Sequence, residues 1–192
     1  METFYRTHSY LVEHTNAPVR RDLMDEIDWN DRLIGIKGTR GVGKTTFLLQ
    51  YAKEKFGTDR SCLFINMNNF YFSKYTLVDF AGEFVKRGGK VLLIDQVFKY
   101  PEWSHDLRAC YEKFPGLKIV FTGSSVMRLK EENPELSGIV KVFITDWLAQ
   151  TVQWMPLITQ KTVWLVAPAL ILGAVALSVV ASSISLRRYL KA

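Results

Sequence analysis

The sequence predicts a three-layer αβα sandwich built on a five-stranded, mainly parallel sheet. Two observations support this fold class: short β-rich runs alternate with helical patterns from residue 32 to residue 144, and runs such as 91–95 are apolar until their last residue. Alternation of this kind is typical of parallel sheets that carry helices on both faces. A length of 192 residues leaves room for one such domain and an appendage.

The expected elements follow one another in a regular order. Strands are expected at residues 32–38, 61–67, 90–95, 117–123 and 138–144. Helices are expected at residues 45–56, 76–88 and 101–114, with a short one before the last strand. Gly88 and Gly89 should close the second helix, and Pro101 should open the third. Residues 1–144 therefore form the predicted domain.

The composition excludes several classes of protein. A chain with 48% hydrophobic and 23% charged residues is globular, and it is neither disordered, collagen-like nor a disulfide-stapled miniprotein. The net charge of +6 divides into +3 over residues 1–141 and +3 over residues 142–192, so the first part has an ordinary surface and nucleic acid is disfavoured as a partner. Cys62 and Cys110 have no metal-ligand spacing, and we expect two packed, reduced thiols.

The strongest motif begins where the first predicted strand ends. It satisfies the pattern GxxxxGK[ST] and opens a helix, as a phosphate-binding P-loop requires. Its residues are Gly38, Thr39, Arg40, Gly41, Val42, Gly43, Lys44 and Thr45, followed by Thr46. Glycines allow the backbone N–H groups to surround phosphates, Lys44 should contact the β- and γ-phosphates, and the Thr45 hydroxyl should ligate Mg²⁺. Thr46 supplies a second hydroxyl, either for packing or near the α-phosphate.

A second motif supplies the acid of the metal site. Residues 91–94 are apolar and Asp95 follows them, which is the pattern of a Walker B strand. Asp95 should hold Mg²⁺ through water. The next residue is Gln96, whose amide can orient a water molecule but cannot accept its proton, so slow hydrolysis is expected unless another group substitutes. Glu102 and Asp106 are the nearby acids, with no reason in the sequence to prefer either.

The fourth predicted strand ends in hydroxyl residues. Ser124 is the candidate sensor of the γ-phosphate, and a helix N-cap is the alternative role for Ser124 or Ser125. Arg128 is a solvated helix charge or, less favoured, a transition-state arginine. The predicted catalytic set is thus Lys44, Asp95, Gln96 and Ser124, and the metal set is Thr45 and Asp95.

The segments GIKGTRGVGKTT, LLIDQVFKYPEWSHDLRACYEKF, IVFTGSS and NPELSGIVKV together resemble prokaryotic AAA-type ATPases that occur as stand-alone ATP-binding proteins. The resemblance covers residues 5–142. It implies a strand-inserted P-loop domain that binds ATP and Mg²⁺, with Gly38 to Thr46 on the phosphates, Asp95 as Walker B acid and Ser124 as sensor. The chain departs from the family pattern at about Phe143, where a helical lid would follow.

The composition changes after residue 144. Residues 145–161 are expected to form an amphipathic linker, residues 162–186 a transmembrane helix and residues 187–192 a basic tail. The 25 residues from 162 to 186 carry no charge, and a helix of that length covers the roughly 30 Å hydrocarbon core of a bilayer. A buried core helix is the alternative. The tail also resembles the last membrane helix of cell-division ABC-transporter permeases, which implies a fusion or frameshift product, or a genuine short form.

Topology adds a conflict, because a cytoplasmic ATP-binding domain would place Arg187, Arg188 and Lys191 outside, against the positive-inside rule. A re-entrant segment, a tail anchor that overrides the rule, or a non-native tail would each resolve it. Two functions from different classes remain: a membrane-tethered ATPase, and a nucleotide-binding interaction module without significant hydrolysis. A nucleic-acid binder ranks third, and the protein partner is unknown.

Overall fold

The computed structural model describes residues 1–16, 18–124 and 135–144. The predicted linker, transmembrane helix and basic tail lie outside these residues, as do the predicted short helix before the last strand and Arg128. Within the described ranges, no helix has both the length and the apolar character needed to cross a bilayer.

Five strands form a single sheet, which confirms the predicted fold class. They are β1 (Leu33–Gly38), β2 (Cys62–Asn66), β3 (Val91–Asp95), β4 (Lys118–Ser124) and β5 (Lys141–Ile144). Their order is β2-β3-β4-β1-β5, and every neighbouring pair is parallel. β4 lies between β1 and β3 and is parallel to both. The segments that follow β1 and β3 therefore begin at the same edge of the sheet.

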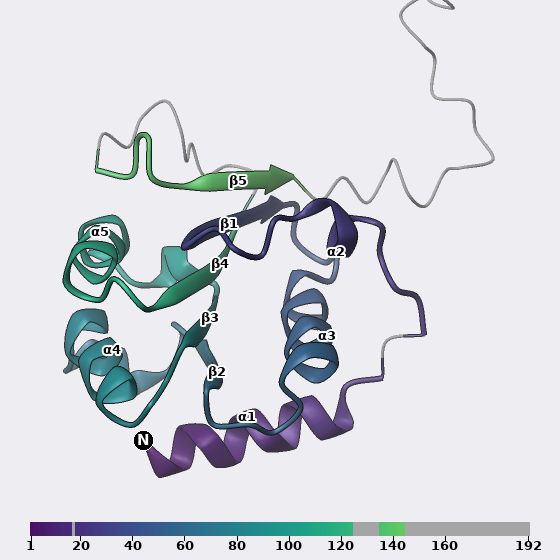
Figure 1. Ribbon diagram of the computed structural model, residues 1–192, viewed down its shortest axis with the longest axis horizontal. Coiled ribbons are helices and arrows are strands. Elements are labelled where there is room, and N and C mark those ends of the chain that lie inside the picture. Colours follow the sequence, from purple (N-terminus) through teal and green to yellow (C-terminus); the bar gives the residue numbers. More distant parts are fainter. Residues whose placement is uncertain (17, 125–134, 145–192) are drawn as a thin grey trace, which may run out of the picture. The chain divides into compact units, whose positions relative to one another are not determined.

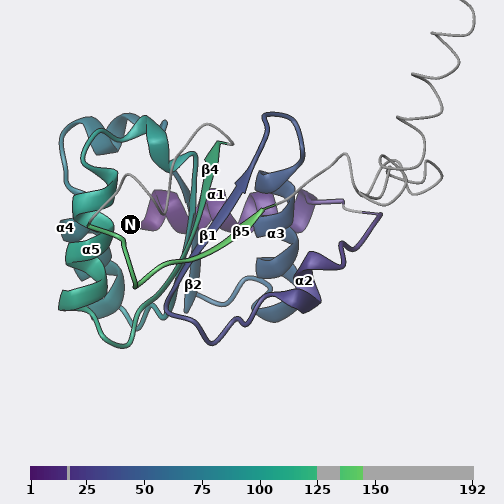
Figure 2. The ribbon, with the colours of Figure 1, turned by 90° about the horizontal axis from the view of Figure 1, so that it is seen from above.

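Helices cover both faces of this sheet (Figures 1 and 2). α4 (Leu77–Lys86) and α5 (Trp103–Lys113) lie on one face, whereas α3 (Lys44–Lys55) and the short α2 (Leu23–Glu26) lie on the other. Two short 3₁₀ turns, η1 (Phe70–Ser73) and η2 (Val97–Lys99), follow β2 and β3.

The strand residues alternate between two apolar cores. In β2, Leu63 and Ile65 belong to the core beneath α4 and α5, whereas Cys62 and Phe64 belong to the core beneath α3. This alternation follows from the two-residue period of a strand. Because both faces are covered, the strand must be apolar at every one of these positions.

A helix that the sequence did not predict, α1 (Glu2–His14), lies beside β2 at the edge of the sheet (Figure 1). It contributes Tyr5 to one core and Val12 to the other, so it packs across the sheet edge. Between them, the buried His8 accepts a hydrogen bond at Nδ1 from the backbone N–H of Phe64, at 3.0 Å. An edge strand presents unpaired backbone groups, and α1 covers this edge.

The predicted boundaries differ from the observed ones by a few residues. The third predicted helix begins at Trp103 instead of Pro101, because residues 100–102 form a turn before it. The second ends at Lys86, and Gly88 adopts a φ of 85° just beyond it, in the left-handed region that glycine tolerates. Cys62 and Cys110 are buried free thiols, as predicted, and burial raises the pKa of each to about 12.

Candidate nucleotide-binding site

The GxxxxGK[ST] segment forms the turn between β1 and α3. Gly41 and Gly43 have φ values of 86° and 77°, a conformation that disfavours side chains, and Gly43 is the N-cap of α3. Lys44 opens the helix and curls back over the turn, donating hydrogen bonds from Nζ to the carbonyl oxygens of Gly38 at 2.8 Å and Thr39 at 2.7 Å. The loop therefore has the curvature and the helix N-terminus that phosphate binding requires.

Asp95 is the centre of the polar network beside this loop. Its side chain is only 1% exposed, and three side chains donate hydrogen bonds to its carboxylate. Thr45 Oγ1 at 2.9 Å and Asn66 Nδ2 at 3.1 Å contact Oδ2, and Thr122 Oγ1 contacts Oδ1 at 2.6 Å. Each donor comes from a different element, namely α3, β2 and β4, so the fold converges on this carboxylate.

Gln96 follows Asp95 in an unusual conformation. Its φ of 55° and ψ of 46° are left-handed, a region that costs a residue with a side chain on the order of 1 kcal/mol or more. The backbone N–H of Gln96 donates to Thr122 Oγ1 at 3.0 Å, which holds the turn in place. The same hydroxyl therefore fixes both the acid and the residue that follows it.

An arginine from the segment before α2 also reaches the loop. Arg21 donates through Nη2 to the carbonyl oxygen of Val42, and Nη2 lies so near Gly43 that a side chain at that position would meet it at 2.6 Å. Burial lowers the pKa of Lys44; the nearby Asp95 raises it and the nearby Arg21 lowers it further. Two cations therefore lie close together at the start of α3, an arrangement that favours an anionic ligand.

The phosphate loop, Asp95 and Gln96 border a cavity of about 740 Å³. Its walls include Arg40, Gly41, Gly43, Lys44, Thr45, Thr46, Asn68, Asp95, Gln96, Phe98, Lys99 and Thr122. The volume falls in the range typical of cofactor sites. Cations and backbone N–H groups suit a polyphosphate, and Phe98 adds an exposed aromatic ring.

The donor set also fits Mg²⁺. The cation prefers oxygen ligands and usually retains several waters, and Thr45 Oγ1 and Asp95 Oδ2 already lie 2.9 Å apart beside the loop. When bound, the metal would neutralise charge on the phosphates. A hydroxyl and a carboxylate, with room in the cavity for water, supply the ligands predicted from the sequence.

The structure places the remaining predicted residues as follows. Ser124 ends β4 and pairs in register with Gly38, the first residue of the phosphate loop. Asp106 is buried and accepts hydrogen bonds from Tyr100 Oη at 2.7 Å and the backbone N–H of Leu77 at 3.1 Å, so it connects α5 to α4. Glu102 is exposed at the start of α5. Neither acid is among the residues that border the cavity.

Several residues of the site were not among the predicted site residues. Asn66, like Thr122, is a polar residue at the end of an apolar strand, and this position in a parallel sheet was a signal that could have identified it. Arg21 lies in a segment with no recognisable pattern, and only the folded chain brings it to the loop. Ser124 is the hydroxyl residue favoured from the sequence, yet Thr122 is the one that contacts Asp95.

Comparison with known families supports this description. A family model described as an AAA domain matches residues 30–148, which include the phosphate loop, Asp95 and all five strands. The chain belongs to the AAA domain family. As a family member it is a nucleotide-binding, ATPase-like protein, and ATP with Mg²⁺ is the ligand that this family generally binds.

Solved structures resemble the chain distantly. PCH-2 from C. elegans matches with 19% identity and a TM-score of 0.41, over 73% of this chain and 41% of that protein. Trip13 from Rhizobiales matches with 14% identity and a TM-score of 0.38, over 74% of this chain and 59% of that protein. The chain thus spans about half the length of these relatives. A search of curated proteins gave no match.

Proposed function

We propose that this AAA domain binds MgATP in the cavity around Lys44, Thr45 and Asp95, and that it hydrolyses ATP slowly. The observation that carries the proposal is the convergence of Thr45, Asn66 and Thr122 on the buried carboxylate of Asp95, next to the phosphate loop. A carboxylate held by three donors is fixed before the ligand arrives, so little reorganisation accompanies metal binding.

The residues of the chain have distinct roles in this proposal. The backbone N–H groups of residues 41–46 and the Lys44 ammonium bind the phosphates, and Asp95 holds metal-bound water. Gln96 orients the attacking water through its amide, since it follows Asp95 and borders the same cavity. No proton acceptor is assigned at Gln96, so turnover depends on positioning and charge stabilisation.

The experiment is phosphate release by the full chain, compared with Lys44→Ala and Gln96→Glu. Wild type should release phosphate slowly, and Lys44→Ala should reduce release to background. Gln96→Glu supplies a general base and should raise the rate about tenfold or more. Equal release by wild type and Lys44→Ala would mean that the activity belongs to a contaminant.

The second candidate is a nucleotide-binding interaction module without significant hydrolysis. The residue after Asp95 is Gln96 and not a carboxylate, and this favours a module without hydrolysis. In that case wild type binds ATP tightly and releases no phosphate above background, whereas Gln96→Glu gains activity. Turnover of wild type at ordinary ATPase rates, about 1 per second or faster, would exclude this candidate.

We also propose a cytoplasmic ATP-binding domain tethered to a membrane through residues 162–186. The support is the uncharged run of 25 residues, which is long enough to span a bilayer. The full chain should float with liposomes and resist extraction by alkaline carbonate, and a chain without residues 162–192 should remain in the soluble fraction. Flotation of both chains to the same extent would contradict the tether.

A further inference from the structure

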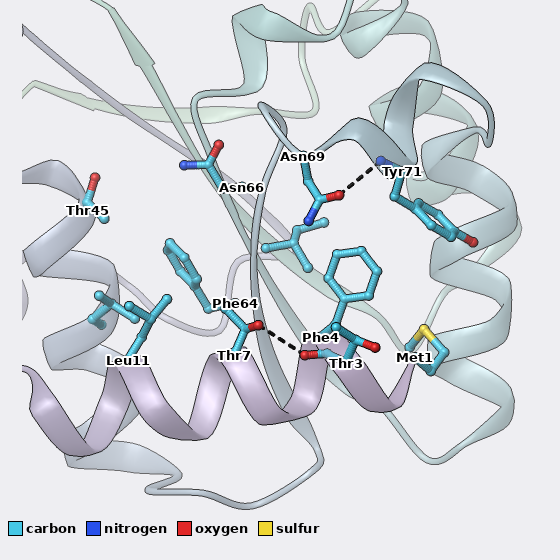
Figure 3. Close-up of a pocket in the computed structure, with 12 residues that line it drawn as sticks. Met1, Thr3, Phe4, Thr7, Leu11, Thr45, Phe64, Asn66, Asn69 and Tyr71 are labelled. Atoms are coloured by element: carbon cyan, nitrogen blue, oxygen red, sulfur yellow. Dashed lines mark hydrogen bonds between the residues drawn. The ribbon is translucent and has the colours of Figure 1, made fainter.

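A second cavity, of about 610 Å³, lies next to the phosphate loop but outside the nucleotide cavity. Its walls come from α1, the end of β2, the start of α3 and the segment around η1 (Figure 3). Phe4, Thr7 and Leu11 face it from one side of α1, spaced three and four residues apart. Phe64 and Asn66 reach it from β2.

The chemistry of its walls differs from that of the nucleotide cavity. Phe4, Leu11, Leu49, Phe64 and Ile65 give the walls an apolar body, and the polar groups are hydroxyls and amides. No charged side chain is among the described residues that line it, whereas cations and Asp95 line the nucleotide cavity. An apolar cavity of this volume with a few polar groups suits a small organic molecule, and the lack of charged side chains in the lining disfavours a second nucleotide.

Polar groups in this second cavity retain hydrogen-bonding capacity. Asn69 accepts a hydrogen bond at Oδ1 from the backbone N–H of Tyr71 at 2.9 Å, and Figure 3 shows its amide nitrogen on the opposite side, toward the other lining residues. Thr7 Oγ1 donates to the carbonyl oxygen of Thr3 at 3.0 Å, which leaves its lone pairs as acceptors. The cavity thus offers both donors and acceptors to a neutral ligand.

Two residues connect this cavity to the nucleotide site. Thr45 lines both cavities. Asn66 lines the second cavity and donates to Asp95 Oδ2, the same oxygen to which Thr45 donates. When Thr45 leaves this oxygen for a metal, Asn66 still donates to it, so a ligand that moves Asn66 also acts on the carboxylate of the metal site.

From this geometry we propose that the second cavity is a binding site for a neutral amphipathic small molecule with an aromatic or aliphatic body. Its occupancy is coupled through Asn66 and Asp95 to the nucleotide, and this coupling rests on the proposed function. Coupling between two ligands is reciprocal, so MgATP changes the affinity for the amphipathic molecule by the same factor as the molecule changes the affinity for MgATP.

The test uses trifluoromethyl-phenyldiazirine, a neutral aromatic photoaffinity probe, on the full chain. Labelled peptides are mapped by mass spectrometry, which separates the cavity from the apolar residues 162–186. Saturable labelling should fall within residues 1–11 and 64–71. Thr7→Trp, an exposed position on the cavity face of α1, should weaken this labelling about tenfold by filling the space. Tyr10→Trp, an exposed ring of α1 outside the lining, is the matched control and should label like wild type.

Binding of a fluorescent ATP analogue is measured on the same samples. A failure of the second-cavity site can then be distinguished from a failure of the nucleotide site. Saturable labelling that is absent, or equally strong in Thr7→Trp and Tyr10→Trp, overturns the site whatever the nucleotide does. If the nucleotide binds, non-hydrolysable MgATP analogue should change the labelling about fivefold or more in wild type and little in Asn66→Leu. Nucleotide binding without any change in wild-type labelling overturns the coupling.

Discussion

At the scale of single residues, the proposed nucleotide site depends on how Asp95 is held. A carboxylate that is 1% exposed is costly to bury unless hydrogen bonds compensate, and three donors from three elements do so here. Thr45 is the donor expected to leave Asp95 for the metal, whereas Thr122 stays behind. Thr122 is therefore the residue that keeps Asp95 in place in both states.

Thr122→Val tests this role, since the two side chains have nearly the same shape. The substitution removes the hydrogen bond to Asp95 and leaves the backbone N–H of Gln96 without its acceptor. We expect the free energy of unfolding to fall by about 2 kcal/mol and MgATP affinity to fall about tenfold. Chemical denaturation and titration with a fluorescent ATP analogue measure the two effects. Thr122→Ser retains the hydroxyl and should restore most of both; a Val variant that binds like wild type would exclude the role.

Arg21 and Arg20 form a natural pair for a second test. Arg21 donates to the phosphate loop at Val42, whereas Arg20 forms exposed ion pairs with Asp25 and Glu54. Arg21→Ala removes a cation beside Lys44, so ATP affinity should fall about tenfold. Arg20→Ala removes the same charge from the surface and should leave ATP affinity within about twofold of wild type. Titration with a fluorescent ATP analogue measures the ATP affinity of both variants. Equal effects of the two variants would show that only the total charge matters.

At the scale of elements, α1 is the helix that contributes to several parts of the fold at once. It covers the edge of β2, joins both cores through Tyr5 and Val12, and forms one wall of the second cavity. His8 attaches it to the strand by accepting from the backbone N–H of Phe64, which requires a neutral ring. Burial lowers the pKa of His8, in keeping with this role.

This hydrogen bond makes the attachment of α1 dependent on pH. Because the folded pKa of His8 lies below its unfolded value of about 6.5, the unfolded chain binds more protons in the interval between them. The free energy of unfolding should therefore fall as pH decreases below about 6.5, by at most about 1.4 kcal/mol per pH unit for one proton. Denaturation curves from pH 7.5 to 5 measure the slope.

His8→Asn is the matched variant for this slope. The Asn side-chain oxygen can accept from Phe64 as Nδ1 does, but it does not titrate in this range. The variant should lose part of the pH dependence while its stability at pH 7.5 changes by less than about 1 kcal/mol. An identical slope in wild type and His8→Asn would assign the acid sensitivity to other groups.

The sequence predicted the elements whose patterns are local. The five strands, α3, α4 and α5 appear within a few residues of their expected positions, because apolar runs, glycines and the phosphate-loop motif mark them. α1 was not predicted, since its apolar residues are few and become meaningful only against the edge of β2. Thr122 was passed over for Ser124 for a related reason: the register of β4 against Asp95 is a property of the assembled sheet.

At the scale of the whole molecule, the two buried thiols report on global opening. Cys62 lies in β2 and Cys110 in α5, on opposite faces of the sheet, and burial raises the pKa of both to about 12. Neither thiol should react with a thiol reagent in the folded protein, so reaction requires unfolding. A saturating nucleotide stabilises the folded state, by about 2.7 kcal/mol when its concentration is 100 times Kd.

MgATP should therefore slow the labelling of Cys62 and Cys110 alike, by up to about a hundredfold at that concentration. Alkylation followed by mass spectrometry measures each thiol separately. In Lys44→Ala the nucleotide should give no protection, which is the control. Fast labelling of one thiol in the absence of nucleotide would show that its part of the fold opens independently.

Calorimetric titration of the full chain with MgATP, beside Lys44→Ala and Asp95→Asn, tests whether the phosphate loop and Asp95 form a nucleotide site. We expect one saturable site in wild type, loss of binding in Lys44→Ala, and ATP binding in Asp95→Asn that no longer gains from Mg²⁺. If wild type does not bind MgATP, or if all three proteins bind it alike, the loop and Asp95 do not form a nucleotide site.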